Sequence, residues 1–184
     1  VLDRAVTEIS RRHAILRTTF PEVDGRPTQL VHPPEQVRVA RFDVRGATGR
    51  ANQIVARELH GGFDVTRLPL IRWTAIRLAD TEYELILIEH HLVHDGWSFA
   101  QLMLELRAIY TTYSRRLDSP LPEPVIQYYD YSRCQRSGLS TPAMRAQAEY
   151  WRSRFATLPP ELVLPTDHPR PKTLSFRGNT LRIE

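Results

Sequence analysis

The chain has 184 residues and a mass of 21.3 kDa, which is the size of one domain or of one lobe of a larger domain. Hydrophobic residues make up 41% and charged residues 25% of the sequence. These fractions are ordinary for a globular protein and exclude collagen, a coiled coil and wholesale disorder. No run approaches the roughly 18 apolar residues of a membrane span, and the first residues do not resemble a signal peptide, so we expect no membrane partner.

The formal net charge is +4, and arginine supplies almost all of the positive charge. Of the 25 basic residues only Lys172 is a lysine, which leaves 24 arginines. They are scattered along the chain rather than gathered with aromatic residues, so we interpret them as a solvated surface and expect no nucleic-acid partner. Cys134 is the single cysteine, which excludes an internal disulfide and a cysteine zinc site and fits a reducing, cytoplasmic setting.

The first 60 residues are expected to alternate helices and short strands. The apolar spacing predicts, in order, a helix over 1–13, a strand over 16–20, its hairpin partner over 29–31, a strand over 37–42 and a helix over 47–60. Asp24 and Gly25 are the signal for a tight turn, and Gly61 with Gly62 ends the last of these helices.

The remainder of the chain begins with the two strongest strand signals. The pattern predicts, in order, strands over 70–78 and 83–89, helices over 97–116, 126–136 and 143–155, a proline-rich irregular segment from residue 158, and a last strand over 174–183. This order predicts an α/β fold of the α+β type, with helices packed on a mixed sheet. Since the last strand has no partner after it, we expect the chain to be a piece of a longer domain.

The segment HHLVHDGWS over 90–98 is the candidate for chemistry. The strand over 83–89 delivers His90 and His91 at its C-terminal end, and Ser98 with the glutamine three residues later forms a capping-box pattern before the next helix. The segment is therefore predicted to be a strand–loop–helix turn that places His91 at the edge of the sheet, close to a helix N-terminus.

An imidazole with a pKa of about 6.5 can accept a proton from an attacking amine or hydroxyl at neutral pH, so His91 suits acyl transfer. Asp95 is too near in the chain to be assumed a charge-relay partner of His91 and can equally hold the loop by pairing with an arginine. Gly96 permits a close approach or an unusual backbone angle. Two other interpretations stay open from these residues: a structural histidine at a strand end, and a metal site of the three histidines and Asp95. The absence of an HExxH motif and of cysteine ligands disfavours a metal, and by default we interpret His90 and His94 as structural.

The pattern HHxxxDG at 90–96 resembles the motif of condensation domains of nonribosomal peptide synthetases, which belong to the chloramphenicol-acetyltransferase-like superfamily. Four further segments resemble the family's motifs in the family's order: RHAILRTTF at 12–20, YYDY at 128–131 followed by Gln135, YW at 150–151 and LPTDHPRP at 164–171. Ser132 and Cys134 depart from the pattern, because the family commonly has Ala and Trp there. These departures concern local packing more than chemistry.

The resemblance implies two acetyltransferase-like lobes with an active-site tunnel between them. Residues 1–171 would be the N-terminal lobe without its first strand and motif, and residues 172–184 would begin the strand that crosses to the missing C-terminal lobe. A donor and an acceptor carrier protein would dock at opposite ends of the tunnel and present their substrates on phosphopantetheine arms, with no cofactor bound by the domain itself. The missing lobe and the neighbouring synthetase domains would be the other partners.

By the same resemblance, His91 is the catalytic residue, which deprotonates or orients the attacking amine. Asp95 would pair with an arginine, for which Arg12 and Arg17 are the candidates, and Gly96 would line the narrow point of the tunnel. The supporting motif residues are His90, Asp95, Gly96, Trp97, Ser98, Arg12 and Arg17. The other family-motif residues, for which core packing and helix capping are the simpler explanation, are Tyr128, Asp130, Tyr150 and Trp151.

Related activities differ at these same positions. Heterocyclising relatives replace the motif with DxxxxD, epimerising relatives usually continue as DGVSWR, and oxygenase-recruiting relatives alter the second histidine and the glycine, whereas this chain keeps both and reads DGWSF at 95–99. Peptide-bond formation between carrier-bound acyl or aminoacyl thioesters is therefore the predicted function. The alternatives are a free-standing acyltransferase that makes an ester or amide, and a non-catalytic lobe that docks carrier proteins. The isolated chain is expected to be inactive because half of the tunnel wall is absent.

Overall fold

A computed structural model describes residues 1–169, 171–173, 175 and 178–182 of the chain. The chain divides into two compact units, Val1–Gly138 and Leu139–Glu184. The first unit contains the sheet and the histidine segment, and the second contains a helix followed by irregular chain.

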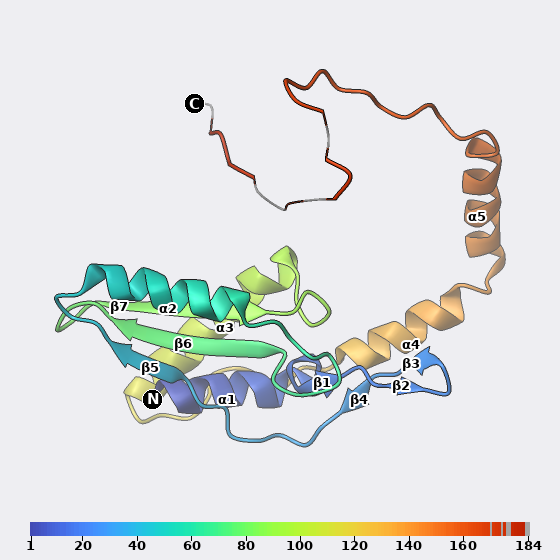
Figure 1. The fold of residues 1–184 in the computed structure, drawn as a ribbon. Helices are drawn as coiled ribbons and strands as arrows, with labels where there is room; N and C mark the ends of the chain where they lie inside the picture. Colours follow the sequence, from blue (N-terminus) through green and yellow to red (C-terminus); the bar gives the residue numbers. More distant parts are fainter. Residues whose placement is uncertain (170, 174, 176–177, 183–184) are drawn as a thin grey trace. The chain divides into compact units, whose positions relative to one another are not determined.

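A three-stranded sheet forms the centre of the first unit (Figure 1). Its strands are β5 (Ala40–Asp43), β6 (Ile71–Arg77) and β7 (Tyr83–Glu89), in the order β5-β6-β7. β5 runs parallel to β6, and β7 pairs with β6 antiparallel in a register that places Glu89 opposite Ile71. The mixed sheet predicted from the sequence is therefore confirmed, and β6 and β7 lie where the strongest strand signals placed them.

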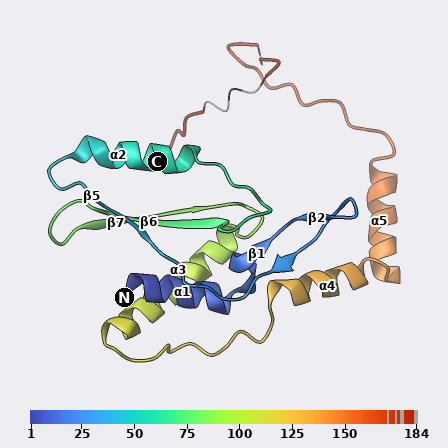
Figure 2. The same ribbon diagram turned by 60° about the horizontal axis from the view of Figure 1, so that its bottom comes forward.

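One face of the sheet is covered by α2 (Thr48–His60), as Figures 1 and 2 both show. Ile54 of this helix packs with Ile76 of β6 in a small buried core. The helix ends at Gly61, whose N–H donates to the carbonyl of Arg57 (3.2 Å). Both the helix predicted over this segment and its glycine stop are confirmed.

The opposite face carries α1 (Leu2–Arg12) and α3 (Gly96–Ser114), which pack against each other and against the sheet (Figure 2). Trp73 of β6 and Leu106 of α3 are buried together in this larger core. Successive side chains of a strand point to opposite faces, so Trp73 and Ile76 reach different cores and β6 is buried on both sides.

The segment after α1 differs from the prediction. Instead of a strand over 16–20, a short 3-10 helix, η1 (Ala14–Arg17), precedes a two-residue strand, β1 (Thr18–Thr19). The side chain of Leu16 joins the larger core, and this packing outweighs the strand propensity of the segment. β1 pairs antiparallel with β4 (Leu30–Val31), so the predicted hairpin partner is confirmed.

Between β1 and β4 the chain forms a second, smaller hairpin from β2 (Glu22–Val23) and β3 (Arg26–Pro27). Asp24 and Gly25 join these strands with φ angles of 52° and 73°. Both angles lie in the left-handed region that a tight hairpin turn of the Asp-Gly type requires. The predicted turn is confirmed, and it closes this inner pair of strands.

The last two helices are α4 (Tyr128–Gly138), which ends the first unit, and α5 (Pro142–Arg154), which lies in the second. The side chain of Thr141 caps α5 by accepting a hydrogen bond from the N–H of Met144 (3.4 Å), and Pro142 occupies the first turn. Both predicted helices are therefore confirmed.

The strand predicted over 174–183 falls partly outside the described part of the chain, which leaves out 174, 176–177 and 183. The described residues of that range, 175 and 178–182, belong to no strand, so the prediction is wrong for them. A strand forms only where a neighbouring strand supplies partners for its backbone N–H and C=O groups.

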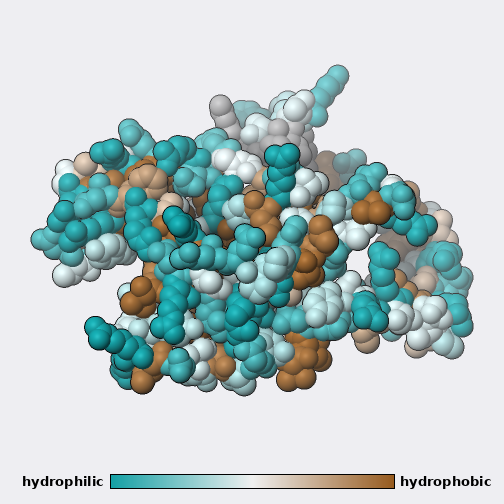
Figure 3. Space-filling model, turned by 90° about the horizontal axis from the view of Figure 1, so that it is seen from below, coloured by the Kyte–Doolittle hydropathy of each residue, from teal (hydrophilic) through white to brown (hydrophobic). Residues whose placement is uncertain are grey.

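The surface seen in Figure 3 is mostly hydrophilic, with separate hydrophobic patches between the polar regions. Among the described residues, no helix combines the length and the apolar character needed to cross a membrane.

Leu106 and Leu104 provide a matched test of the larger core, because both belong to α3 but differ in exposure, 4% against 62%. We expect Leu106→Ala to lower the free energy of unfolding by about 2–5 kcal/mol, because the change leaves a cavity beneath α3. Leu104→Ala should change it by about 0.5 kcal/mol or less. Urea unfolding of the 184-residue chain measures both, and equal losses would contradict the assignment of the buried face of α3.

Candidate active site

The histidine segment connects β7 to α3, and Asp95 caps the helix with extended backbone angles (φ −143°, ψ 176°). Its Oδ1 accepts the N–H of Ser98 (2.8 Å), while Oγ of Ser98 accepts the N–H of Asp95 (2.9 Å). These reciprocal bonds form a capping box. Our prediction that Ser98 begins the box is wrong, because Asp95 already satisfies the terminal N–H groups and Ser98 falls inside the first turn.

The same hydrogen bonds determine the charge of Asp95. The N–H and the hydroxyl of Ser98 hold the pKa of the Asp95 carboxyl below its ordinary value, so it is ionised at neutral pH. We expected Asp95 to pair with Arg12 or Arg17, but no such pair forms within the described residues. Arg12 pairs with Glu105 instead, and Arg17 donates to a backbone carbonyl.

His90 and His91 follow β7 in different surroundings. The N–H of His90 extends the sheet by donating to the carbonyl of Leu70 (2.9 Å), and its Nδ1 accepts the N–H of Leu92 (3.1 Å). The N–H of Val93 then closes a turn onto the carbonyl of His90 (3.0 Å). His91 is exposed within this turn and makes no side-chain hydrogen bond in the described part of the chain, so its imidazole faces solvent.

His94, the third histidine of the segment, is buried, and its Nδ1 contacts Oε1 of Glu89. The three imidazoles therefore lie in three different environments rather than around one point. Across the residues that the structure describes, no group of three or more His, Cys, Asp or Glu side chains is arranged to hold a metal ion.

Gly96 and Trp97 begin α3. The φ of Gly96 is not in the left-handed region, and apart from its two chain neighbours and the backbone of the first turns of α3, no described atom lies within 4 Å of the place a Cβ would occupy. Neither a close approach nor an unusual backbone angle among the described residues therefore requires glycine at this position, and the place of Gly96 at the narrow point of a tunnel stays a prediction. Trp97 is 90% exposed and presents its ring to solvent in the first turn of the helix.

A buried charged cluster joins the end of α1 to α3. Nε of Arg12 lies 3.3 Å from Oε2 of Glu105, and Nε2 of His13 lies 2.8 Å from the same oxygen. The side-chain amide of Gln101 donates to the other oxygen of Glu105 (3.2 Å). Sequence reasoning missed Glu105, although a glutamate within the apolar stripe of a helix is a signal that a buried cation faces it.

The environment of Glu105 contains two opposing influences on its pKa. Burial raises the pKa of the carboxyl, but hydrogen bonds from His13, Gln101 and Arg12 outweigh the burial, so the pKa lies below its ordinary value. Glu105 is consequently ionised at neutral pH and balances the charge of Arg12. The buried pair fixes α1 against the helix that follows the histidine segment.

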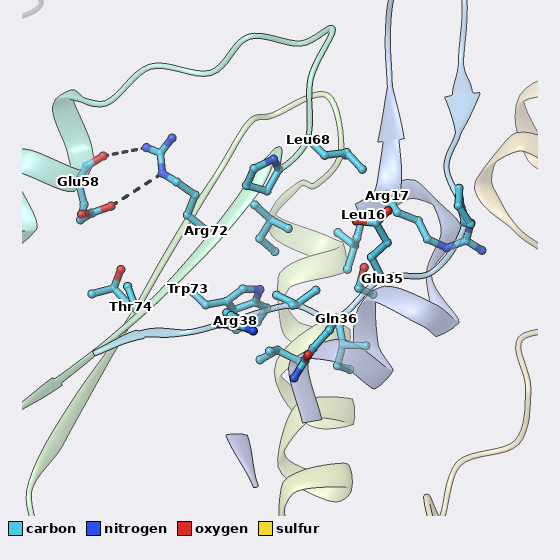
Figure 4. A pocket seen from close by; sticks show the side chains of 18 residues that line it. Leu16, Arg17, Glu35, Gln36, Arg38, Glu58, Leu68, Arg72, Trp73 and Thr74 are labelled. Carbon is cyan, nitrogen blue, oxygen red and sulfur yellow. Dashed lines mark hydrogen bonds and ion pairs between the residues drawn. The ribbon is translucent and has the colours of Figure 1, made fainter. Parts of the chain in front are cut away.

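Arg17 lies on the wall of a cavity of about 440 Å³ between η1 and the start of β6 (Figure 4). Trp73 contributes to its apolar lining, and Arg72 is held at its other side by the carbonyl of Glu58 (2.9 Å). No residue of the segment 90–98 lines this cavity. The structure therefore places Arg17 in a different environment from His91.

The other motif residues of the first unit organise the start of α4. Oδ2 of Asp130 accepts the N–H of Gln127 (3.1 Å), and the side chain of Gln127 bonds the backbone of Arg12 (2.8 Å) and Ala14 (2.9 Å). The capping role expected for Asp130 is thus observed. Tyr128 is half exposed and does not belong to the described cores, which differs from the packing we expected.

Tyr150 and Trp151 lie on α5 in the second unit. Both are exposed there, and the ring of Trp151 stacks on that of Phe155 with centroids 5.7 Å apart. The core packing expected for these two residues is not observed among the described residues.

Comparisons with known proteins assign this lobe to a family. The profile of the family described as "Condensation domain" matches residues 1–184. Chondramide synthase cmdD of Chondromyces crocatus is 40% identical over 183 residues, which are 97% of this chain and 5% of that synthase. Malpinin synthetase of Mortierella alpina is 37% identical over 185 residues, which are 99% of this chain and 2% of that synthetase. The X-domain in its complex with OxyB from teicoplanin biosynthesis is 26% identical, with a TM-score of 0.80 over 92% of this chain and 38% of that chain.

The chain therefore belongs to the condensation-domain family. One relative, CymA of Salinispora arenicola, is described as a probable non-canonical nonribosomal peptide synthetase and is 36% identical over 190 residues, which are 99% of this chain and 2% of that protein. The chloramphenicol-acetyltransferase-like α/β fold expected from the sequence is confirmed. The chain spans only a small part of the synthetases it matches, and about two fifths of the X-domain chain.

Removing Glu105 tests the buried cluster. Glu105→Ala leaves Arg12 buried without its partner, so we expect the free energy of unfolding at pH 7 to fall by about 3–5 kcal/mol. Asp118→Ala, which removes the partner of Arg4 in an exposed ion pair, is the control and should have little effect. Urea unfolding measures both variants, and a Glu105→Ala variant as stable as the control would contradict the role of the cluster.

The lowered pKa of Glu105 also predicts a pH dependence. Because the folded-state pKa lies below the unfolded value of about 4.3, the stabilisation from Glu105 is complete above that pH and is lost as the pH falls through the folded pKa. Glu105→Ala should therefore lose less stability than the wild type between pH 5 and pH 2. If the free energies of unfolding of the two proteins fell equally between pH 5 and pH 2, this assignment would be contradicted.

Proposed function

We propose that the chain is most of the N-terminal lobe of an amide-forming condensation domain, with residues 1–171 as the lobe and residues 172–184 as the start of the crossing to a second lobe. The observation that carries the proposal is the exposed imidazole of His91, which stands in a tight turn where β7 ends and just before α3 begins. The membership of the condensation-domain family supports it.

In this proposal His91 acts on an amine carried by the acceptor protein. The amine nitrogen attacks the thioester carbonyl of the donor, the C–N bond forms and the C–S bond breaks. The proton lost by the amine passes to the imidazole of His91 and from there to the departing sulfur, or passes to that sulfur while the imidazole orients the amine, and the donor arm leaves as its thiol. Catalysis then depends chiefly on orientation, because both reactants arrive bound to proteins.

The substrates would reach the site on the phosphopantetheine arms of donor and acceptor carrier proteins, and the domain itself would need no bound cofactor. A relative named for peptide synthesis supports amide formation: phosphinothricin tripeptide synthetase PhsB of Streptomyces viridochromogenes is 36% identical over 189 residues, which are 100% of this chain and 16% of that synthetase. The second lobe and the neighbouring synthetase domains would complete the tunnel, so the isolated chain would be inactive.

A recruiting lobe without catalysis is the second candidate, and one observation favours it. The X-domain that resembles this chain is known in a complex with OxyB. Against this candidate, the chain keeps both His91 and Gly96 of the HHxxxDG pattern. A free-standing acyltransferase would differ by accepting an acyl-coenzyme A donor in place of a carrier protein.

The test uses the full condensation domain with both carriers loaded with simple aminoacyl groups. Intact-protein mass spectrometry should show the acceptor carrier gaining one donor acyl group. We expect His91→Ala to slow this transfer about 10²- to 10⁴-fold, because no imidazole is left to accept the proton of the amine or to orient the amine. His60→Ala, at the exposed end of α2, is the matched control and should react at the wild-type rate.

Three outcomes would contradict the proposal. Transfer at the wild-type rate by His91→Ala would remove His91 from catalysis. Transfer from acyl-coenzyme A without any carrier would indicate the free-standing acyltransferase. No transfer by the wild type, together with binding of a carrier, would indicate the recruiting lobe.

A further inference from the structure

Glu89 and His94 stand at the two ends of the turn that carries His91. Glu89 is the last residue of β7, and His94 immediately precedes Asp95, the cap of α3. Nδ1 of His94 contacts Oε1 of Glu89 at ion-pair distance. The two side chains therefore meet across the residues His90 to Val93 and close the turn from within.

The imidazole of His94 is buried, since 2% of its side chain is exposed, and it stands edge-on to the ring of Phe99 with centroids 5.7 Å apart. Both of its nitrogens and Oε2 of Glu89 are shielded from solvent and form no hydrogen bond of regular geometry in the described part of the chain. Burying polar groups in this way is costly. The contact with Glu89 is the polar interaction that offsets this cost.

Other contacts hold the two ends of the turn, and within it the N–H groups of Leu92 and Val93 donate to Nδ1 and to the carbonyl of His90. The backbone of His90 is bonded to Leu70 on β6, and Asp95 is bonded to Ser98 of α3. His91 lies between these anchors without a side-chain hydrogen bond of its own within the described residues. The direction of its imidazole therefore depends on the shape of the turn, which the contact between residues 89 and 94 spans.

We propose that Glu89 and His94 form a positioning pair, which holds the turn in the shape from which His91 meets its substrates. This inference rests on the proposed function of His91. Glu89 and His94 would act by positioning His91 and would not contact the substrates. The contact joins two buried polar groups across the turn, so it ties residue 94 to residue 89 and with them the two ends of the turn.

The test again uses the full condensation domain with its loaded carriers. His94→Leu keeps a buried apolar side chain and removes both nitrogens, whereas His94→Asn keeps a donor near the place of Nδ1. We expect His94→Leu to lower kcat per folded domain about 10- to 100-fold, with KM for the acceptor carrier unchanged, because a misplaced imidazole slows the chemical step. His94→Asn should recover most of the loss, and His60→Leu should leave both constants unchanged.

A second comparison separates positioning from simple packing. In a His91→Ala background, His94→Leu should cause no further loss, because the imidazole that the pair positions is already gone. The proposal is overturned if His94→Leu keeps kcat within about twofold of the wild type, if only KM rises, if Asn fails to restore activity, or if the loss is the same without His91.

Circular dichroism shows whether each variant folds. If His94→Leu does not fold, Glu89→Gln becomes the test, because it keeps the shape of the side chain and removes the charge. A loss of kcat of about 5-fold or more at unchanged KM supports the pair, and a wild-type kcat overturns it. If His91→Ala itself retains the wild-type kcat, the proposed function fails, and that result is read independently of the variants at residues 89 and 94.

Discussion

The antiparallel pairing of β7 with β6 is the constraint on which the site depends. Its register places Glu89 opposite Ile71, and the last rung is the bond from the N–H of His90 to the carbonyl of Leu70. Among the described residues no strand pairs with the chain beyond His90, so the chain turns there, and α3 takes up the backbone hydrogen bonding again after its cap at Asp95. The position of His91 is therefore determined by the point at which the hydrogen bonds between β6 and β7 end.

Two hydrophobic cores hold the paired strands β6 and β7 in position, because α2 covers one face of β6 and α1 with α3 covers the other. The ion pair between Arg12 and Glu105 lies within the second of these layers. A buried ion pair adds little net stability compared with apolar packing, but it is strongly destabilising to break. We interpret it as the feature that fixes α1 and α3 in one arrangement, and with them the N-terminal end of α3.

This arrangement suits a reaction in which position matters more than chemical power. In the proposed reaction an activated thioester and an amine react once they are aligned, and the proposal assigns only the orientation of the amine or the transfer of its proton to the imidazole of His91. No residue of the histidine segment lines the cavity beside Arg17. The carboxylate of Asp95 caps the N-terminus of α3 and forms no ion pair with an arginine among the described residues. Within this lobe the motif therefore consists of one exposed imidazole and a set of residues that shape the turn beneath it.

Local sequence signals were enough to predict the strands β6 and β7, the helices α2 and α3, and the turn that bears His90 and His91, because hydrophobic period and turn residues are local properties. They did not predict η1, where packing of Leu16 overrides strand propensity, nor which residue caps α3, since Asp95 and Ser98 both fit the local pattern. The partners of the buried polar groups emerged from the tertiary fold alone. Glu105 meets Arg12 from 93 positions away, and His94 turns inward to Glu89, because burial in a shared core, not spacing along the chain, selects such contacts.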